Sequence, residues 1–348
     1  MGLREKIRSR DMAIWMGVIA ALWISPCVGA SRDLDAEGNL KNASYAHINK
    51  DVCPGKTEVI TCDFSKLITR DFSKTSKLSK DLKFRKISPN VVTRSKDSLE
   101  LVLSQEHENT AIVNAANAVH PGGGFLSKGF VQEETLCAVT SLYLSLKEQK
   151  KNYPLRKSGI HKILWTTDVK PIIRMTSIPE DESVRFLSHR VLGAFKNGKN
   201  VFLNVSEIKR AQSLGVFSLA APQRDKMREF KHKRFFWDMY QQYTAVLQKF
   251  EEHSQGWHPQ KGGRLIFTIP GSGAFAKRKD NTLDHEYLTL NVCALASAIL
   301  MVEPCFEIII PKSMADRKDL GQEIVGYVTT PWRLMRKLRD YEIHSVLI

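Results

Sequence analysis

The sequence predicts an α/β sandwich, and three observations lead to that fold class. Short apolar runs alternate along the chain with longer segments of helical pattern. The runs at 216–219, 265–269 and 306–310 are largely apolar, which is typical of strands covered on both faces of a sheet. Glycine-rich turns follow two of the strand candidates. No internal repeat or linker divides the 348 residues, so we expect one large domain over 56–348, with a helix at its C-terminal end.

The individual elements follow in chain order. We expect strands at 91–92, 111–113, 163–165, 201–205, 216–219, 265–269 and 306–310. We expect helices at 97–105, 132–149, 225–252 and 284–301, with Asp97 or Ser98 capping the first and Asp284 capping the last. The helix at 225–252 is rich in aromatic residues beside Lys231, Lys233 and Arg234. Aromatic rings at helical spacing are typical of a core face, although rings beside cations also hold single-stranded nucleic acid.

The amino terminus has the layout of a secretory signal peptide. Basic residues between Arg4 and Arg10 precede the apolar run Ala13–Ile24, and small residues follow up to Ala30. We expect residues 1–30 to be cleaved on export, with no stable membrane association afterwards. An uncleaved anchor at 13–24 is the alternative, although about 20 apolar residues are needed to span a bilayer. Residues 31–55 are predicted to be a loose lead-in, and 63–88 a solvated helix or loop.

Charge and cysteine content restrict the function only loosely. The chain carries a formal net charge of +15, which favours polyanionic ligands without choosing among them. Five cysteines follow the signal peptide, at positions 53, 62, 137, 293 and 305, and none of them forms a CxxC pair. Disulfides Cys53–Cys62 and Cys293–Cys305 are one interpretation for an exported protein, and five free thiols are the other.

The most informative segment is 111–134. A predicted strand enters the Asn-rich turn 114–117, three glycines follow at Gly122, Gly123 and Gly124, and Gln132-Glu133-Glu134 opens a helix. Tandem glycines let backbone N–H groups approach a phosphate closely. Two adjacent carboxyl groups allow acid and base roles to be divided. A second turn, 270–275, follows the predicted strand 265–269 with the sequence Pro-Gly-Ser-Gly-Ala-Phe, and it supplies a second wall for a diphosphate.

These motifs resemble a known family. Residues 113–117 resemble the strand end of ADP-ribose-binding macrodomains. The triple glycine and the Gln-Glu-Glu run resemble the signature of poly(ADP-ribose) glycohydrolase, and His120-Pro121 is similar to the Asn-Pro of its microbial branch. The resemblance is strongest over 111–146 and extends over about 55–312. It implies a macrodomain-like three-layer α/β/α sandwich with a mixed, mostly parallel sheet, and hydrolysis of ribose–ribose O-glycosidic bonds that releases ADP-ribose.

The resemblance also implies roles for individual residues. Glu134 would be the general acid and then the general base, Glu133 would hold the distal ribose hydroxyl groups, and Gln132 would orient the pair. Asn117 would bind the same ribose, and Phe275 would pack against the adenosine or the proximal ribose. The remaining substrate-binding positions are those of the two glycine turns: Gly122, Gly123, Gly124, Gly271, Ser272, Gly273 and Ala274. Lys277, Arg278 and Lys279 stand where the microbial pattern has Gly-Asn, so the outer edge of the ligand site differs.

One electrostatic conflict remains at the sequence level. A helix N-terminus lowers the pKa of a carboxyl group, whereas an acid catalyst needs that pKa raised. The scheme needs no metal and no cofactor. Its expected partners are poly(ADP-ribose) or an ADP-ribosylated protein, with ADP-ribose as the product. The alternatives are a mono-ADP-ribosyl hydrolase, a non-catalytic ADP-ribose-binding macrodomain, and a basic nucleic-acid-binding protein, which we favour least because both glycine turns would then lack a role.

Overall fold

The computed structural model describes residues 34–63, 90–94, 96–104, 109–126, 131–157, 159–181, 183–184, 186–227, 229–255, 263–311 and 320–343. The predicted signal peptide, and all but the start of the segment predicted at 63–88, lie outside these residues. The chain divides into two compact units, Met1–Glu37 and Gly38–Ile348. Of the first unit only residues 34–37 are described, as the start of a helix, and the fold below is that of the second unit.

The second unit is built on a mixed sheet of eight strands in the order β1-β5-β6-β3-β7-β8-β2, with β4 paired to β5. Strands β6, β3, β7, β8 and β2 pair in parallel, whereas β1, β4 and β6 pair antiparallel with β5. The strands are β1 Thr57–Asp63, β2 Val91–Arg94, β3 Thr110–Ala115, β4 Arg156–Lys157, β5 Ile160–Val169, β6 Leu214–Leu219, β7 Arg264–Ile266 and β8 Glu307–Pro311.

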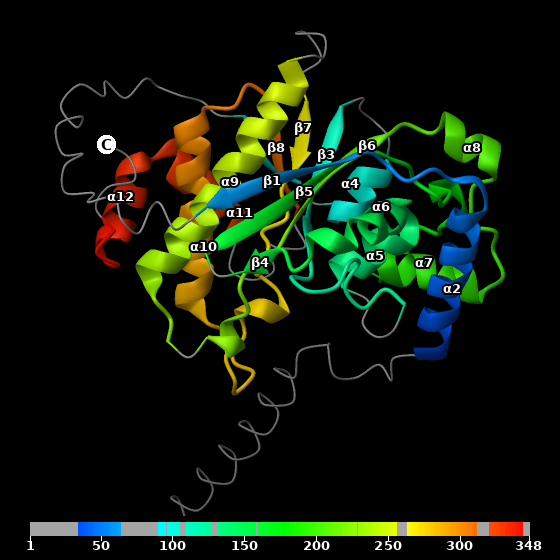
Figure 1. The fold of residues 1–348 in the computed structure, drawn as a ribbon, viewed down its shortest axis with the longest axis horizontal. Helices are drawn as coiled ribbons and strands as arrows, with labels where there is room; N and C mark the ends of the chain where they lie inside the picture. The colour runs from blue at the N-terminus through cyan, green and yellow to red at the C-terminus, as the bar shows by residue number, and fades with distance from the viewer. Residues whose placement is uncertain are drawn as a thin grey trace, which may run out of the picture. The chain divides into compact units, whose positions relative to one another are not determined.

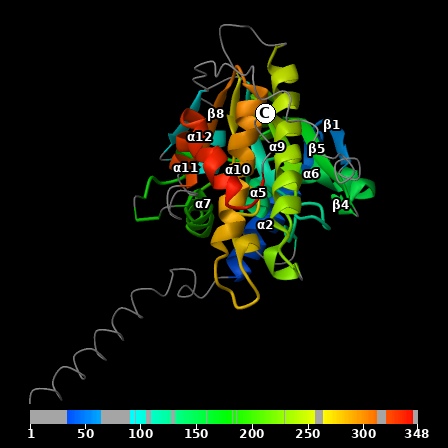
Figure 2. The same cartoon turned by 90° about the vertical axis from the view of Figure 1, so that its left-hand side faces the viewer.

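Helices cover both faces of this sheet. The long helices α9 and α10 lie side by side, with α11 and α12 beyond α10 (Figures 1 and 2). Figure 1 shows α4, α5 and α6 on the opposite side of the strands. The helices are α2 Leu34–Asp51, α4 Ser98–Leu103, α5 Gln132–Val139, α6 Leu142–Glu148, α7 Leu187–Lys196, α8 Val205–Arg210, α9 His232–Gln255, α10 His285–Val302, α11 Leu320–Thr329 and α12 Pro331–Arg339. Single 3-10 turns are η2 Gln149–Asn152, η3 Met175–Ser177, η4 Arg224–Lys226 and η5 Ala274–Ala276. The three-layer α/β/α architecture predicted from the sequence is confirmed.

The alternation of side chains along β3 assigns each face of the sheet its partner helices. Ala111 and Val113 belong to the buried cluster that α9 and α10 complete. Because successive strand residues point to opposite faces, Ile112 and Asn114 face the side of α5. The aromatic residues Phe235 and Phe236 of α9 lie in the first cluster and are 3% and 0% exposed. The core interpretation of this helix is therefore correct, and these two rings are not available for base stacking.

Most predicted elements are present, with tertiary contacts setting their limits. Asp97 caps α4 by accepting a hydrogen bond from the Leu99 amide, and Asp284 caps α10 by accepting from the amides of Glu286 and Tyr287. The predicted helix 132–149 is interrupted between α5 and α6. Thr140 is extended there, and it forms a bridge with Pro171. That pairing with a distant segment outweighs the local helical preference.

Two predictions are wrong. The predicted strand 201–205 ends in helix α8, because Asn204 and Glu207 form a capping box that starts a helix at Val205. The predicted loose lead-in 31–55 contains the 18-residue helix α2. Of its side chains, Leu40, Ser44 and Ile48 recur every four residues and are 0% exposed. Glu37 and Lys41 are buried on the same face, so three of the five buried positions are polar and the face lacks the apolar pattern of an amphipathic helix. The strand β1 was also not predicted.

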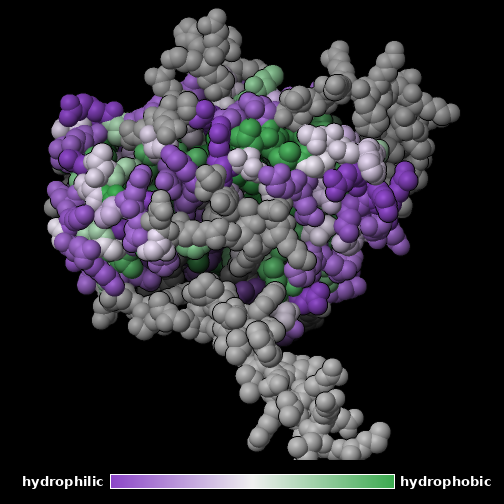
Figure 3. Space-filling model, turned by 180° about the vertical axis from the view of Figure 1, so that it is seen from behind, coloured by the Kyte–Doolittle hydropathy of each residue, from purple (hydrophilic) through white to green (hydrophobic). Residues whose placement is uncertain are grey.

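The five cysteines that the structure describes are free thiols, so the two disulfides considered for an exported protein are not formed. Cys137 and Cys293 are buried, whereas Cys53 and Cys305 are exposed. Among the described residues α10 alone is long and apolar enough to span a membrane, but 67% of it is buried inside the fold, as expected for a core helix. In the view from behind, hydrophilic residues cover most of the described surface and hydrophobic residues gather in a few patches (Figure 3).

Candidate active site

The candidate site lies at the carboxyl ends of the three central strands β6, β3 and β7. The segments that follow these strands are held together by three contacts. The Ala116 amide donates to the Leu219 carbonyl at 2.9 Å, and the Gln132 side chain lies 3.3 Å from Thr268 Oγ1. Gly271 packs against Ala221, since a Cβ added to the glycine would lie 2.8 Å from the Ala221 methyl group. In open α/β sheets this edge is where ligands bind.

The first glycine turn is closed around its own acids. Gly122 and Gly123 have φ angles of +68° and +59°, in the left-handed region that glycine adopts without strain. A Cβ at Gly123 would lie 2.4 Å from Glu134 Oε1 and 2.8 Å from Glu133 Oε2. A Cβ at Gly122 would lie 2.6 Å from the Tyr143 ring. Glycine is therefore required at these two positions because the side chains of the protein itself, the two carboxylates among them, pack directly against the turn.

Each carboxylate accepts a hydrogen bond from a backbone amide of this turn. The Asn117 amide donates to Glu133 Oε2 at 2.7 Å, and the Gly124 amide donates to Glu134 Oε1 at 2.7 Å. Glu133 and Glu134 are only 2% and 6% exposed. The second oxygen of Glu134, Oε2, is buried and has no hydrogen-bond partner among the described residues. A carboxyl oxygen without a partner beside a glycine turn could exchange a proton with a bound substrate.

Glu133 rests on two polar side chains of the sheet. Asn114 Nδ2 lies 3.5 Å from Glu133 Oε1 and donates to Ser218 Oγ at 3.0 Å on the neighbouring strand. Asn114 and Ser218 are directly paired in the β3–β6 register, and both are 0% exposed. Burial is the largest cause acting on the pKa of Glu133 and raises it. The hydrogen bond from the Asn117 amide opposes this rise, the charge of Glu134 adds to it, and the resulting pKa is about 8. The sequence-level conflict is thus resolved for Glu133, where burial outweighs the helix N-terminus.

Gln132 anchors the start of α5 to the sheet. Its Oε1 accepts from the Ala115 amide at 2.8 Å, and its Nε2 donates to the Val113 carbonyl at 3.1 Å. The side-chain amide of Gln132 thus donates to one backbone group at the end of β3 and accepts from another, as the backbone of a neighbouring strand would. These hydrogen bonds fix the turn of helix that carries Glu133 and Glu134, and the orienting role of Gln132 stays a prediction.

The second glycine turn has one enclosed and one open glycine. Gly271 has a φ of +87°, and a Cβ there would lie 2.4 Å from Tyr287 Oη. Gly273 is exposed, and a Cβ there would meet nothing within 4 Å. Ser272 is 6% exposed, and Ala274 and Phe275 form part of the turn η5, with Phe275 partly buried against the core. The turn is supported from below, where Asn291 Nδ2 donates to the Pro270 carbonyl at 2.7 Å.

The cationic segment after this turn folds back on itself. Lys277 pairs with Leu283, and Arg278 Nε donates to Asp284 Oδ2 at 3.1 Å. Arg224 also donates to that Asp284 oxygen, so the segments after β6 and β7 meet at one buried carboxylate. The Arg278 side chain of the predicted cationic edge is therefore held by an ion pair within the protein.

The structure modifies one predicted role and adds residues that the motifs did not indicate. Asn117 holds Glu133 through its backbone, and its Oδ1 accepts from the Val119 and His120 amides within the turn. Among the added residues, Tyr153 has a buried hydroxyl group without a partner in the described structure, and burial, then the charge of Glu133, raises its pKa. Asn114 was recognisable as a polar residue within an apolar strand. Ser218, Thr268 and Tyr153 carry no local signal.

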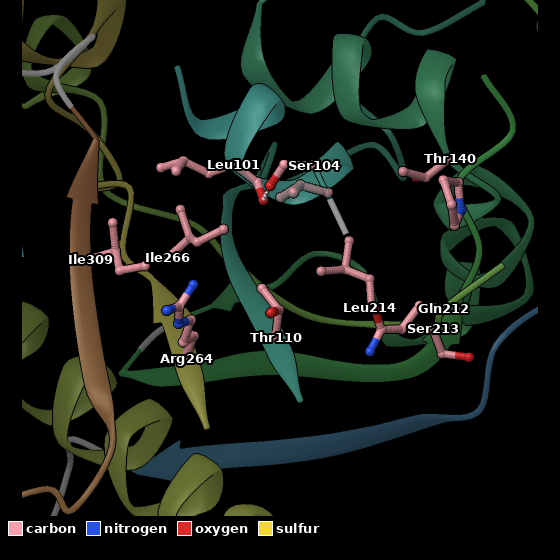
Figure 4. Close-up of a pocket in the computed structure, with 12 residues that line it drawn as sticks. Leu101, Ser104, Thr110, Thr140, Gln212, Ser213, Leu214, Arg264, Ile266 and Ile309 are labelled. Carbon is pink, nitrogen blue, oxygen red and sulfur yellow. Dashed lines mark hydrogen bonds between the residues drawn. The ribbon is translucent and has the colours of Figure 1, made fainter. Parts of the chain in front are cut away.

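A separate cavity of about 40 Å³ lies at the opposite edge of the sheet. Figure 4 shows Thr110, Leu214 and Arg264, the first residues of β3, β6 and β7, among the side chains that line it. Nucleotide-sized ligands occupy pockets of about 300–1,000 Å³, so this cavity is too small for one. We assign it no part in the chemistry of the carboxylate pair.

Residues 48–170 match the family model described as microbial-type PARG, catalytic domain, where PARG stands for poly(ADP-ribose) glycohydrolase. This segment contains the first glycine turn and the Gln-Glu-Glu run, so the resemblance drawn from those motifs is confirmed. The family model that matches this segment is that of the catalytic domain of glycosyl hydrolases. No curated protein sequence matches the chain.

Solved structures agree on the fold. A poly(ADP-ribose) glycohydrolase structure from Thermomonospora curvata covers 85% of this chain and 99% of its own, with 13% identity and a TM-score of 0.51. A structure of poly(ADP-ribose) glycohydrolase from that organism bound to the inhibitor ADP-HPD covers 84% and 98%, with 13% identity and a TM-score of 0.50. A Deinococcus radiodurans structure in complex with ADP-ribose covers 85% and 97% at 16% identity, with a TM-score of 0.41 that carries no argument.

Proposed function

We propose that this chain, which carries the microbial-type poly(ADP-ribose) glycohydrolase segment over 48–170, hydrolyses ribose–ribose bonds in poly(ADP-ribose) and releases ADP-ribose. One observation carries the proposal. Two buried carboxyl groups each accept a hydrogen bond from a backbone amide of the segment after β3, Glu133 from Asn117 and Glu134 from Gly124. One oxygen of Glu134 has no partner in the described structure. An ADP-ribose reader needs no such pair, because a second carboxylate beside a diphosphate would repel it.

The two glycine turns are the proposed binding surface. Gly122, Gly123 and Gly124 would face one side of the ADP-ribose diphosphate, and the turn 271–274 would face the other, with Phe275 against the adenosine or the proximal ribose. Backbone amides in turns of this kind are common anion-binding groups. The proposal is supported by the similar fold of the poly(ADP-ribose) glycohydrolase that was solved with the inhibitor ADP-HPD.

Glu134 is the proposed general acid and base. Its proton would pass to the oxygen that joins the two riboses, the bond from that oxygen to the anomeric carbon would break, and the oxygen would leave as a hydroxyl group. Water would then add to the oxocarbenium-like carbon and return a proton to Glu134. The unpartnered Oε2 supports this assignment, because both oxygens of Glu133 already have partners.

Glu133 would support this step by holding the ribose hydroxyl groups and by keeping a proton in the pair. Its pKa of about 8 means that the isolated site holds that proton at neutral pH. Asn117 would contribute through the amide that fixes Glu133 and through contact with the same ribose.

The decisive experiment measures release of ADP-ribose from polymer-bearing protein by the chain and by Glu134→Gln. Glu148→Gln is the matched control, because Glu148 is exposed at the end of α6, remote from the turn in sequence. We expect release by the wild type and by the control, and none above background by Glu134→Gln. Binding of ADP-ribose without release by the wild type would instead indicate a reader or a mono-ADP-ribosyl hydrolase. If the wild type neither binds ADP-ribose nor releases it from polymer, the proposal is wrong.

We also propose that the protein is exported through residues 1–30, with retention by an uncleaved 13–24 segment as the alternative. The basic residues, the short apolar run and Ala30 support this proposal. Amino-terminal sequencing of the protein recovered outside the cells that express it would test it. A mature chain beginning near Ser31 is expected, whereas a chain that still begins at Met1 would contradict cleavage.

A further inference from the structure

A buried lysine reaches the first glycine turn from helix α2. Lys41 is 3% exposed, and its Nζ lies 3.4 Å from the carbonyl oxygen of Gly124. Gly124 is the residue whose amide holds Glu134 Oε1 at 2.7 Å. The ammonium group therefore contacts the same residue of the turn that orients the proposed acid. Lys41 precedes residue 48, so it lies outside the segment that matches the family model.

Aromatic side chains secure the same junction between α2 and the turn. The ring of Tyr143 packs on Gly122 and lies 4.7 Å from the ring of Phe125, measured between centroids. Tyr45 of α2 meets Tyr143 edge to face at 5.7 Å. The hydroxyl group of Tyr45 also accepts from Lys147 at 3.0 Å, on the exposed side of α6. Helix α2 is thus docked against the turn by several contacts, and Lys41 adds the contact of a charged group with Gly124.

The physical cost of this arrangement indicates that it has a use. Removing an ammonium group from water costs several kcal/mol unless nearby groups compensate it. Gly124 follows the two glycines at positive φ, so the directions of its carbonyl and amide groups depend on the contacts that hold this turn, and Lys41 makes one of them. The charge of Lys41 also acts on the Cys137 thiol. Burial, followed by the carboxylates of Glu133 and Glu134, raises the pKa of this thiol, and the charge of Lys41 opposes that rise.

We propose that Lys41 is a positioning residue for the carboxylate pair, an inference that rests on the function proposed above. By holding the Gly124 carbonyl, Lys41 fixes the plane of the turn, so that the amide of Gly124 stays directed at Glu134 Oε1. The helix predicted as a loose lead-in is then part of the catalytic apparatus. Lys41 touches no reacting atom and acts through Gly124.

The test compares Lys41→Met with Lys147→Met in the full chain. Both variants remove an ammonium group from the α2 junction, but only Lys41 contacts the glycine turn. For Lys41→Met we expect kcat for polymer hydrolysis to fall roughly tenfold with KM changed less than about threefold, because a misplaced catalytic group costs up to about 100-fold. For Lys147→Met both constants should stay near those of the wild type.

Hydrogen exchange separates this inference from the proposed function. Exchange at the amides of 122–125 should be faster in Lys41→Met and unchanged in Lys147→Met, whether or not the protein hydrolyses polymer. Unchanged kcat and exchange in Lys41→Met would overturn the inference, and so would an equal loss of kcat in both variants. If the wild type does not hydrolyse polymer, the proposed function fails and the exchange comparison alone decides the structural role of Lys41.

Discussion

The two glycine turns share a place at the sheet edge but differ in what surrounds them. In the first turn a Cβ at Gly123 would lie against the carboxylates of Glu133 and Glu134, whereas in the second a Cβ at Gly273 would meet open space. The first turn therefore uses its glycines to pack against side chains of the protein, and its amides to hold Glu133 and Glu134. The second leaves one glycine exposed. From this difference we propose that both turns face the ligand, and that the first turn in addition positions the two carboxylates.

Gly123→Ala should break the first turn with the largest effect. A Cβ would come within 2.4 Å of Glu134 Oε1 on a residue with a φ of +59°, so both the carboxylate and the backbone must shift. We expect kcat to fall roughly 100-fold, because displacement of a catalytic group by about 1 Å has that effect. Steady-state hydrolysis of polymer measures it. A variant with wild-type kcat would show that the turn does not position the acid.

Gly271→Ala should act on stability rather than on chemistry. The new Cβ would lie 2.4 Å from Tyr287 Oη and 2.8 Å from Ala221 Cβ, and both of these residues are buried. The backbone of Gly271 is also left-handed, which strains any other residue. We expect the free energy of unfolding to fall by roughly 2 kcal/mol or more, from the backbone strain and the overpacking. Urea denaturation followed by circular dichroism measures the change. An unaltered midpoint would contradict the enclosed geometry of this glycine.

Glu133→Gln should change how stability depends on pH. The pKa of Glu133 is raised from 4.5 to about 8 in the folded protein. Between these values the folded state keeps a proton that the unfolded state releases, so this residue makes stability fall as pH rises through the window. The amide variant carries no such proton. Its free energy of unfolding, measured at several pH values between about 5 and about 8, should therefore fall less than that of the wild type.

Glu148→Gln serves as the control for that pH series, because this exposed carboxylate should leave the slope as it is in the wild type. Parallel curves for the wild type and Glu133→Gln would show that burial does not hold a proton on Glu133. The account of the pair would then lose its electrostatic support.

Gly273→Ala should give the smallest effect and the cleanest contrast with Gly123→Ala. Because the Cβ would meet nothing within 4 Å, stability should change by no more than about 0.5 kcal/mol. The methyl group would, however, stand on the surface proposed for the diphosphate, so ADP-ribose affinity should weaken several-fold. Calorimetric titration measures the affinity, and thermal melting measures the stability. Wild-type affinity would remove Gly273 from the binding surface.

The sequence was most informative where function depends on neighbours in the chain. The glycine turn, the Gln-Glu-Glu run and the caps Asp97 and Asp284 are local patterns, and the structure places them as predicted. The Asn204–Glu207 capping box is equally local, but the apolar residues Val201 to Leu203 before it favour a strand.

What the sequence could not supply is contact across the sheet and between helices. Ser218 meets Asn114 only because β6 and β3 pair in one register, 104 residues apart. Thr268 reaches Gln132 from the neighbouring strand end. Lys41 lies in a helix whose buried face is largely polar and so gives no apolar pattern, and its partner Gly124 is 83 residues away. The motif located the acids, whereas the groups that support them are set by topology.

The central claim is that Glu134 performs the chemistry while the glycine turns bind the ligand. The measurement that tests it most directly is ADP-ribose affinity and polymer hydrolysis on one preparation of Glu134→Gln. We predict an affinity within a few-fold of the wild type and no hydrolysis above background. Hydrolysis at the wild-type rate would contradict the assignment of the acid, and loss of both properties in a folded variant would contradict the separation of binding from chemistry.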